Sequence, residues 1–315
     1  MSLKAMMGFR QYLFTYQSYD DLKNIIRQSK SLFEDTDQVL FMVAVCGDHP
    51  AEELGAVNIV DVRNHSYDIV KSARQVVDEM TGDERTIIVY YSEKKVGLTY
   101  PFALLIEIAR MLGLDFMGLC DSDFQIPYSG IKDSFTDALA KILTRDEPCI
   151  YLPTRVRRSL DLQGYPINRF ATEDLENAYY WRATGLRRIE RLDLQSGVCY
   201  LNKASIDKLD LQGTGAWCGA IELPVQVRMM GGSVVKGMTL ETNPQNESTI
   251  SPEDQFRKIM ELEEQYGIKL AQIINYAKER PKCFMDDWTR GHTKRDIAEI
   301  LQVIEREYDQ FKASS

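Results

Sequence analysis

Two carboxylates stand two residues apart in this chain, directly after a short apolar run. Asp121 and Asp123 follow residues 116–119, which have the composition of a buried strand. Side chains at positions i and i+2 of a strand point to the same side, and just past a strand end both carboxylates still reach one cation. Oxygen ligands suit Mg²⁺ or Mn²⁺, which in turn bind phosphates. The pair indicates a metal site for a phosphorylated ligand, with a polar turn as the plain alternative.

The composition is that of a globular protein with a net negative charge. The chain has 315 residues, of which 44% are hydrophobic, enough for a sizeable core in one large domain or two small ones. The net charge of −9 argues against nonspecific binding to nucleic acid or to an anionic membrane surface. No apolar stretch approaches the roughly 18 residues that span a bilayer, and no signal-peptide pattern is present. We therefore expect a cytoplasmic protein without a transmembrane segment.

The cysteines are scattered, and none forms a Cys-x-x-Cys pair. Most lie in apolar, strand-like runs, so we expect reduced core residues rather than disulfides or a zinc site. The six are Cys46, Cys120, Cys149, Cys199, Cys218 and Cys283.

Strand-like and helix-like segments alternate through the first half of the chain, which predicts an α/β fold with a mainly parallel sheet and helices on both faces. Strands are expected at residues 12–15, 39–45, 57–62, 86–91, 116–119, 149–152, 198–201 and 233–239. Helices are expected at residues 20–33, 68–80, 100–112, 131–143, 173–184, 253–280 and 293–312. We place one domain at residues 1–250 and a helical C-terminal extension, packed on it, at residues 251–315.

Five motifs, taken in order, resemble a known family. Residues 121–127 read Asp-Ser-Asp-Phe-Gln-Ile-Pro, and residues 152–169 are rich in arginine. Residues 193–198 read Asp-Leu-Gln-Ser-Gly-Val, residues 215–223 carry one acidic residue ahead of a helix, and residues 231–235 read Gly-Gly-Ser-Val-Val. This series resembles the family 2 nucleotide-sugar glycosyltransferases of the GT-A fold, and most of all the dolichyl-phosphate mannosyltransferase-like enzymes. The resemblance covers roughly residues 11–241.

The resemblance implies a GT-A-like (Rossmann-like) mixed sheet and a metal-dependent glycosyltransferase. Such an enzyme moves a sugar from a nucleoside diphosphate sugar to a small or phosphorylated acceptor, polyprenyl phosphate included. The resemblance makes Asp123 a ligand of Mg²⁺ or Mn²⁺, and it places Asp121 in contact with the ribose, or with the metal through water. Glu222 becomes the catalytic base, although a carboxylate near a helix N-terminus also simply favours the helix dipole.

Other residues receive roles from the same resemblance, each with a plain alternative. The expected donor-binding residues are Thr15, Tyr16, Asp48 and Lys95. The expected contacts to the donor diphosphate or an acceptor phosphate are Arg155, Arg157, Arg158 and Arg169. Trp217 would stack on a sugar and His292 would complete the metal shell. The alternatives are a solvated loop for the arginines, plain surface for the lysine, a core position for the tryptophan and a helix cap for the histidine.

The chain departs from the family at two strand ends. Residues 15–18 read Thr-Tyr-Gln-Ser where the family has Tyr-Asn-Glu, and residues 45–49 lack the usual Asp-Asp-Gly-Ser. This loss motivates one alternative, a GT-A-like binding or scaffold protein without transfer activity. A second alternative is a sugar nucleotidyltransferase, but the glycine-rich loop typical of that class is missing from residues 14–20. Peripheral membrane contact for a lipid acceptor and the oligomeric state stay open.

Overall fold

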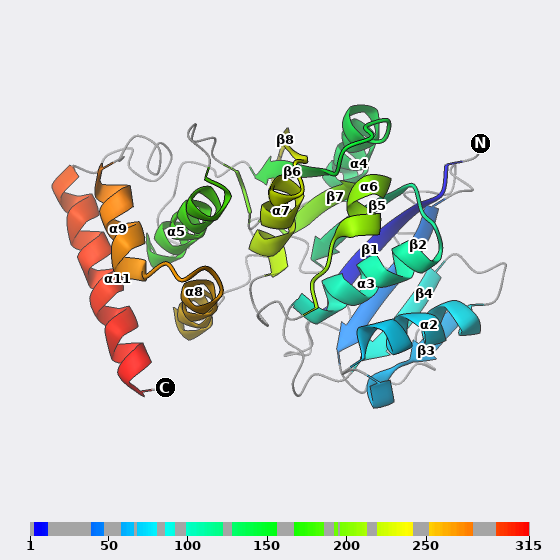
Figure 1. Ribbon diagram of the computed structural model, residues 1–315, viewed down its shortest axis with the longest axis horizontal. Coiled ribbons are helices and arrows are strands. Elements are labelled where there is room, and N and C mark those ends of the chain that lie inside the picture. Colours follow the sequence, from blue (N-terminus) through cyan, green and yellow to red (C-terminus); the bar gives the residue numbers. More distant parts are fainter. Residues whose placement is uncertain are drawn as a thin grey trace.

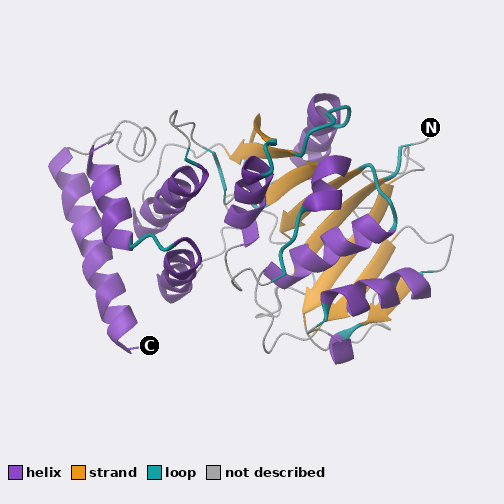
Figure 2. Cartoon of the chain, in the orientation of Figure 1, coloured by secondary structure: helices purple, strands orange, loops and turns teal. Residues whose placement is uncertain are grey.

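The structure is a computed structural model, and its elements are shown in Figures 1 and 2. It describes residues 3–11, 39–46, 58–65, 68–80, 86–91, 99–121, 128–155, 167–185, 192–194, 196–212, 219–241, 252–279 and 294–314.

Eight strands of the described chain form one sheet in the order β3-β4-β2-β1-β5-β7-β6-β8. Their bounds are β1 (Ala5–Gln11), β2 (Val39–Cys46), β3 (Asn58–Asp61), β4 (Thr86–Tyr91), β5 (Phe116–Asp121), β6 (Cys149–Arg155), β7 (Val198–Asn202) and β8 (Ser233–Leu240). Neighbouring strands are parallel except at β7, which runs antiparallel to both β5 and β6. The mixed, mainly parallel sheet is confirmed.

The sheet has an apolar layer on each face because its inner strands are apolar at successive positions. In β4, Val89 packs into the core on one face and Ile88 into the core on the other, and both are fully buried. One face is covered by α4 (Tyr128–Ile142). The other carries α2 (Ile69–Glu79), α3 (Thr99–Met111), α6 (Lys203–Lys208) and α7 (Gly219–Met229). Continuous apolar strands are typical of sheets buried in this way.

The first strand lies earlier than the sequence indicated. We expected it at residues 12–15, but β1 spans Ala5–Gln11, where Met6 and Met7 are fully buried between β2 and β5. Methionine has little preference for strands, and β1 ends in polar residues, so the sequence pattern gave only a weak indication of a strand at these residues. Thr15 and Tyr16 consequently lie several residues beyond the strand end, outside the described residues.

Four helices pack together at one end of the sheet, at the left of Figure 1. They are α5 (Ile167–Thr184), α8 (Pro252–Tyr266), α9 (Leu270–Glu279) and α11 (Lys294–Ser314). α5 precedes the expected boundary at residue 250, yet it packs against all three later helices as well as against α7. The single helix expected at residues 253–280 is divided where Gly267 adopts a φ of 65°, which favours glycine.

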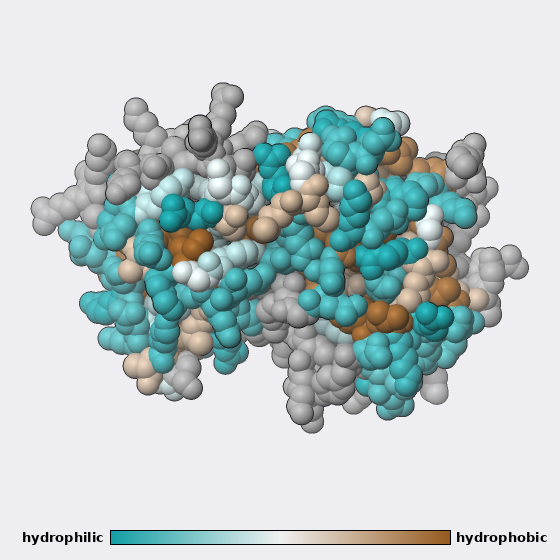
Figure 3. Space-filling model, viewed as in Figure 1, coloured by the Kyte–Doolittle hydropathy of each residue, from teal (hydrophilic) through white to brown (hydrophobic). Residues whose placement is uncertain are grey.

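The exposed surface on the face shown in Figure 3 is mainly hydrophilic, with small apolar patches. Met229 (73% exposed) and Val70 (37% exposed) are the large hydrophobic residues that lie exposed within the described ranges. The buried residues of α2 are Ser72, Ala73 and Val76, so Val70 lies off the face that packs on the sheet. Among the described helices, none combines the length and the apolar character needed to cross a bilayer.

One buried carboxylate joins three of the packed helices. Glu263 of α8 is 6% exposed, and its Oε1 accepts a hydrogen bond of 2.6 Å from the backbone N–H of Leu270 at the start of α9. Lys312 of α11 donates to Oε2 at 2.7 Å. Burial raises the pKa of Glu263, but the hydrogen bonds from Lys312 and Leu270 outweigh burial, so the pKa lies below the ordinary value.

We expect Glu263→Gln to lower the free energy of unfolding by about 1–3 kcal/mol near neutral pH, because the charge-assisted bond from Lys312 is lost. A carboxylate whose pKa is lowered by folding stabilises the protein above its unfolded pKa, and this contribution is lost as the pH falls through the folded pKa. Urea unfolding should therefore show a difference between wild type and variant that shrinks below the ordinary pKa of 4.5. Lys203→Met, which breaks an exposed pair with Asp207, should change stability by less than about 1 kcal/mol. A difference independent of pH would contradict the assignment.

Candidate active site at the carboxyl end of β5

Asp121 is the last residue of β5, at the point where the order of the strands reverses. From β1 the chain builds β2, β3 and β4 on one side and then places β5 on the other side of β1. Arg10 of β1 and Asp121 are register partners at the carboxyl ends of the two parallel strands. Open α/β sheets bind ligands outside the carboxyl ends of their strands at such a reversal. Asp121 thus occupies the position where this sheet is expected to hold a ligand.

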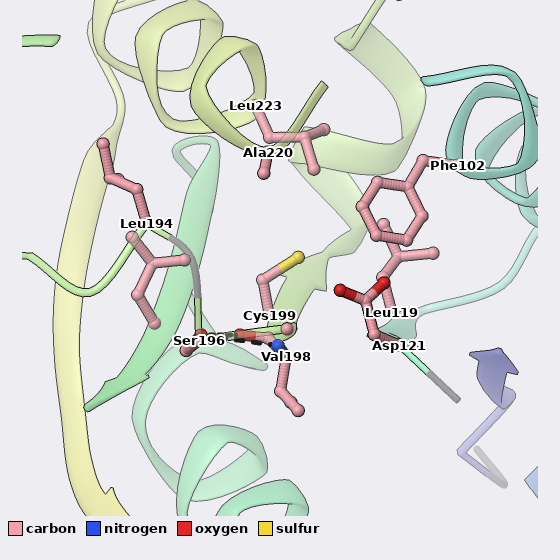
Figure 4. Close-up of a pocket in the computed structure, with 11 residues that line it drawn as sticks. Phe102, Leu119, Asp121, Leu194, Ser196, Val198, Cys199, Ala220 and Leu223 are labelled. Atoms are coloured by element: carbon pink, nitrogen blue, oxygen red, sulfur yellow. Dashed lines mark hydrogen bonds between the residues drawn. The ribbon is translucent and has the colours of Figure 1, made fainter. Parts of the chain in front are cut away.

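A pocket opens beside Asp121 (Figure 4). Its cavity volume is about 20 Å³, roughly the space of one water molecule, and its lining residues are apolar apart from Asp121, Ser196 and Gly197. The apolar walls come from α3, α7, the sheet and the connection before β7, through Phe102, Leu119, Leu152, Leu194, Val198, Cys199, Ala220 and Leu223. The carboxylate of Asp121 lies next to the Phe102 ring in this view. Apolar walls with a few polar groups are typical of small-molecule sites, and at this size a ligand larger than water would lie across the mouth of the recess.

A glycine turn holds the backbone of Asp121 in place. The N–H of Asp121 donates to the carbonyl of Gly197 at 2.7 Å. Gly197 has a φ of +72°, and a Cβ added there would lie 3.3 Å from Oδ2 of Asp121. Only glycine meets both demands without strain or crowding. β5 accordingly extends to Asp121, so this carboxylate ends the strand instead of following it.

Ser196 shapes the same turn, and the sequence interpretation gave it no role. Its Oγ donates to the carbonyl of Val198 at 2.8 Å, and its N–H donates to the carbonyl of Asp193 at 3.2 Å. The motif at residues 193–198 was visible in the sequence. Its function as the wall of a pocket depends on the pairing of β7 with β5, which the motif does not reveal.

Arg155, expected to bind phosphate, instead has a carboxylate partner within the protein. Its Nε and its backbone N–H both lie 2.9 Å from Oδ2 of Asp193, and its Nη2 lies 2.7 Å from Oδ1. The two side chains are only 6% and 4% exposed. A buried, bidentate pair of this kind already neutralises the guanidinium, which makes it a poor phosphate ligand.

Glu222, the expected base, is buried in α7 at 7% exposure. Its Oε1 accepts a hydrogen bond of 3.0 Å from Gln226, and its Oε2 accepts bonds from Gln265 and Tyr266 of α8. Ala220 and Leu223 of the same helix line the pocket, but Glu222 is absent from its lining. The structure therefore directs this carboxylate toward α8.

Most other expected site residues lie outside the described part of the chain. These are Thr15, Tyr16, Asp48, Lys95, Asp123, Arg157, Arg158, Trp217 and His292. The backbone of Arg169 belongs to α5, but its side chain is not described. Within the described ranges, three or more His, Cys, Asp or Glu side chains nowhere gather as a metal site would require. The metal site stays a prediction that rests on Asp123 and His292.

The described cysteines lie in the core. Cys120, Cys149 and Cys199 are buried thiols outside any disulfide, and Cys199 also lines the pocket. Burial raises the pKa of the Cys149 thiol. The aromatic cluster of α5 is likewise core, with Tyr179, Tyr180 and Trp181 at most 2% exposed.

The sequence matches no protein-family model and no curated protein. Solved structures with a related shape include a protein assigned as a nucleotide-diphospho-sugar transferase from Desulfovibrio desulfuricans G20, 8% identical, with a TM-score of 0.36 over 99% of both chains. They also include the galactosyltransferase LgtC in complex with donor and acceptor sugar analogues, 11% identical, with a TM-score of 0.35 over 74% of this chain and 73% of the other.

A third similar structure is the UTP-bound UGPase from Acinetobacter baumannii, 10% identical, with a TM-score of 0.40 over 90% of this chain and 96% of the other. These scores and identities are too low to assign the chain to any of the three classes of protein.

We expect Gly197→Ala to destabilise the protein by about 1–2 kcal/mol, because alanine is strained at this φ. The new Cβ should also press on Asp121 and weaken the bond between its N–H and the Gly197 carbonyl. Hydrogen exchange of the Asp121 amide should then accelerate. Gly185→Ala is the matched control, with a φ of +63° and nothing within 4 Å of an added Cβ. Equal Asp121 exchange in the two variants would show that Gly197 does not support the carboxylate.

Proposed function

We propose that this chain is a glycosyltransferase that takes a sugar from a nucleoside diphosphate sugar and delivers it to a small or phosphorylated acceptor. The observation that carries the proposal is the place of Asp121, at the carboxyl end of β5 where the strand order reverses. The family resemblance gives this carboxylate its chemistry, because the motif that begins at Asp121 is the one that holds a metal-bound diphosphate in the family.

The donor would lie across the carboxyl ends of β1, β2 and β5. Thr15, Tyr16, Asp48 and Lys95 are proposed to contact it, and Arg157, Arg158 and Arg169 to contact phosphate oxygens. Asp123, with His292, would hold Mg²⁺ or Mn²⁺, and Asp121 would contact the ribose, or the metal through water; carboxylate oxygens are donors of the kind such cations prefer. A bound metal of this kind supplies charge neutralisation for the leaving diphosphate.

The acceptor would enter the pocket between Asp121 and α7. The apolar walls supplied by Phe102, Leu194 and Leu223 would exclude water, which otherwise competes as acceptor. Trp217 is proposed to stack on a sugar ring. A lipid phosphate is one acceptor of the proposed class, alongside soluble phosphorylated compounds.

The sugar nucleotidyltransferase alternative is weakened by the position of β1. That class binds its nucleotide with a glycine-rich loop after the first strand, and residues 12–38, which connect β1 to β2, contain no glycine. A binding or scaffold protein without transfer activity keeps the donor site but needs no base. Donor binding and turnover must therefore be measured separately.

Thermal unfolding of the purified protein with UDP-, GDP- and ADP-sugars tests donor binding. One donor should raise the midpoint only when Mn²⁺ is present, by a stabilisation of roughly 2.7 kcal/mol at a hundredfold excess over the dissociation constant. Asp121→Asn and Asp123→Ala should each remove most of the metal-dependent part. Asp115→Asn, a carboxylate at the start of β5, is the control and should retain it.

No metal-dependent shift with any of the three donors would sink the proposal. A shift without turnover on any acceptor would favour the binding protein. Formation of nucleotide sugar and pyrophosphate from nucleoside triphosphate and sugar phosphate would favour the nucleotidyltransferase.

Glu222→Gln tests which of two roles Glu222 has: the proposed catalytic base, or a residue that joins α7 to α8 through hydrogen bonds. As a general base, Glu222 is worth about a hundredfold or more in kcat, with donor binding unchanged. Its hydrogen bonds to Gln265 and Tyr266 support the joining role instead. Steady-state kinetics and urea unfolding of the same variant decide between them: lost stability with intact kcat would remove Glu222 as the base.

A further inference from the structure

We infer that Arg155 and Asp193 are positioning residues that hold the wall of the pocket against Asp121. This inference rests on the proposed function for the identity of the ligand, but not for the structural role. The ion pair is directional, because the guanidinium edge formed by Nε and Nη2 meets both oxygens of one carboxylate. The backbone N–H of Arg155 adds a third bond to the same group. Such a fork accepts essentially one relative orientation of its two partners.

The two partners belong to segments that are far apart in the chain. Arg155 ends β6, and Asp193 lies in the connection that leads from α5 to β7. Just before Asp193, the N–H of Leu192 donates to Oδ1 of Asn177 in α5 at 3.3 Å, and Asn177 is 1% exposed. The connection is therefore fixed to the sheet through Arg155 and to the helices through Asn177.

From Asp193 the constraint passes directly into the pocket wall. The carbonyl of Asp193 accepts from the N–H of Ser196, which closes a turn, and Gly197 follows with its carbonyl on the N–H of Asp121. Five of the residues that line the pocket belong to this turn and the start of β7. They are Leu194, Ser196, Gly197, Val198 and Cys199. A shift of Asp193 must consequently move the wall and the backbone contact to Asp121 together.

Burial makes the pair sensitive to the loss of either member. With both side chains almost inaccessible to water, removing one charge leaves the other uncompensated. Arg155→Lys keeps the positive charge but lacks the planar fork. It is therefore the most conservative substitution that should loosen the turn between Asp193 and Gly197. Arg63→Lys is the matched control, since Arg63 pairs with Asp61 at the opposite edge of the sheet, where the side chains are 39% and 46% exposed.

The rate at which iodoacetamide alkylates each cysteine, followed by peptide mass spectrometry, measures how accessible the pocket wall is in the absence of any ligand. Cys199 lies in the wall, whereas Cys149 is fully buried at the start of β6, the strand that carries Arg155. Arg155→Lys should raise the rate at Cys199 by about tenfold or more and leave Cys149 unchanged, because only a local opening is expected. Arg63→Lys should change neither rate.

Parallel acceleration at Cys199 and Cys149 would show a general loss of stability and overturn the positioning role, as would no acceleration at either. If Arg155→Lys fails to fold, the alkylation rates at Cys199 and Cys149 are measured in Asp193→Glu instead. This variant keeps both charges and displaces the carboxylate by one methylene.

A second arm measures the dissociation constants of UDP, GDP and ADP in the presence of Mn²⁺. Arg155→Lys should weaken binding of the preferred nucleotide by about tenfold, whereas Arg63→Lys should not, because Asp121 depends on the turn. If Arg155→Lys keeps its nucleotide affinity while Cys199 is alkylated faster, the ion pair positions the pocket wall but does not contribute to ligand binding, and that part of the inference is overturned. If the wild type binds none of the three nucleotides, the proposed function fails, while the alkylation rates still decide the positioning role.

Discussion

The hydrogen bond from the N–H of Asp121 to the carbonyl of Gly197 is the contact on which the candidate site depends. It joins the end of a central parallel strand to the turn that precedes the antiparallel strand of the sheet. Without it, the reversal of strand order would still create a crevice, but the Gly197 turn would no longer hold the backbone of Asp121 at its edge. The left-handed backbone of Gly197 and the close approach to Asp121 show how little freedom this junction has.

Support for this junction comes from both halves of the molecule. Arg155 fixes the turn to β6, and Asn177 fixes its approach to α5, which itself packs among the C-terminal helices. α7 lies between the same two parts, with Ala220 and Leu223 in the pocket and Glu222 bonded to α8. The helical part is therefore connected to the site through two independent routes. Helices that only covered the sheet would need neither the bond from Leu192 to Asn177 nor the bonds from α8 to Glu222.

The sequence predicted the sheet well where strands are continuously apolar, as in β2 and β4. Such runs are typical of strands that are buried on both faces. It misplaced β1 because methionines and a polar end give a weak strand pattern. It missed the break at Gly267 because helical spacing continues on both sides of that residue. The first error arises where tertiary packing overrides a weak local pattern. The second arises where a glycine in the left-handed region ends a helix whose apolar spacing continues beyond it.

The site was predictable only in part. Asp121 stood out because two carboxylates after an apolar run are visible in the sequence itself. Arg155 belongs to an arginine-rich segment, which led us to expect phosphate binding, whereas its carboxylate partner Asp193 lies 38 residues away. Burial of an ion pair between distant segments follows from topology, and no local spacing reports it. The same limit applies to Glu222, whose partners on α8 lie more than 40 residues further along the chain.

The most direct measurement of the central claim is a crystal structure with Mn²⁺ and a nucleoside diphosphate, with the metal located by anomalous scattering at the manganese edge. The account predicts one manganese peak near the Asp121 carboxylate at the carboxyl end of β5, with the nucleotide bound at the same place and the Gly197 turn in contact with Asp121. A nucleotide bound elsewhere, or a metal that avoids this carboxylate, would contradict it.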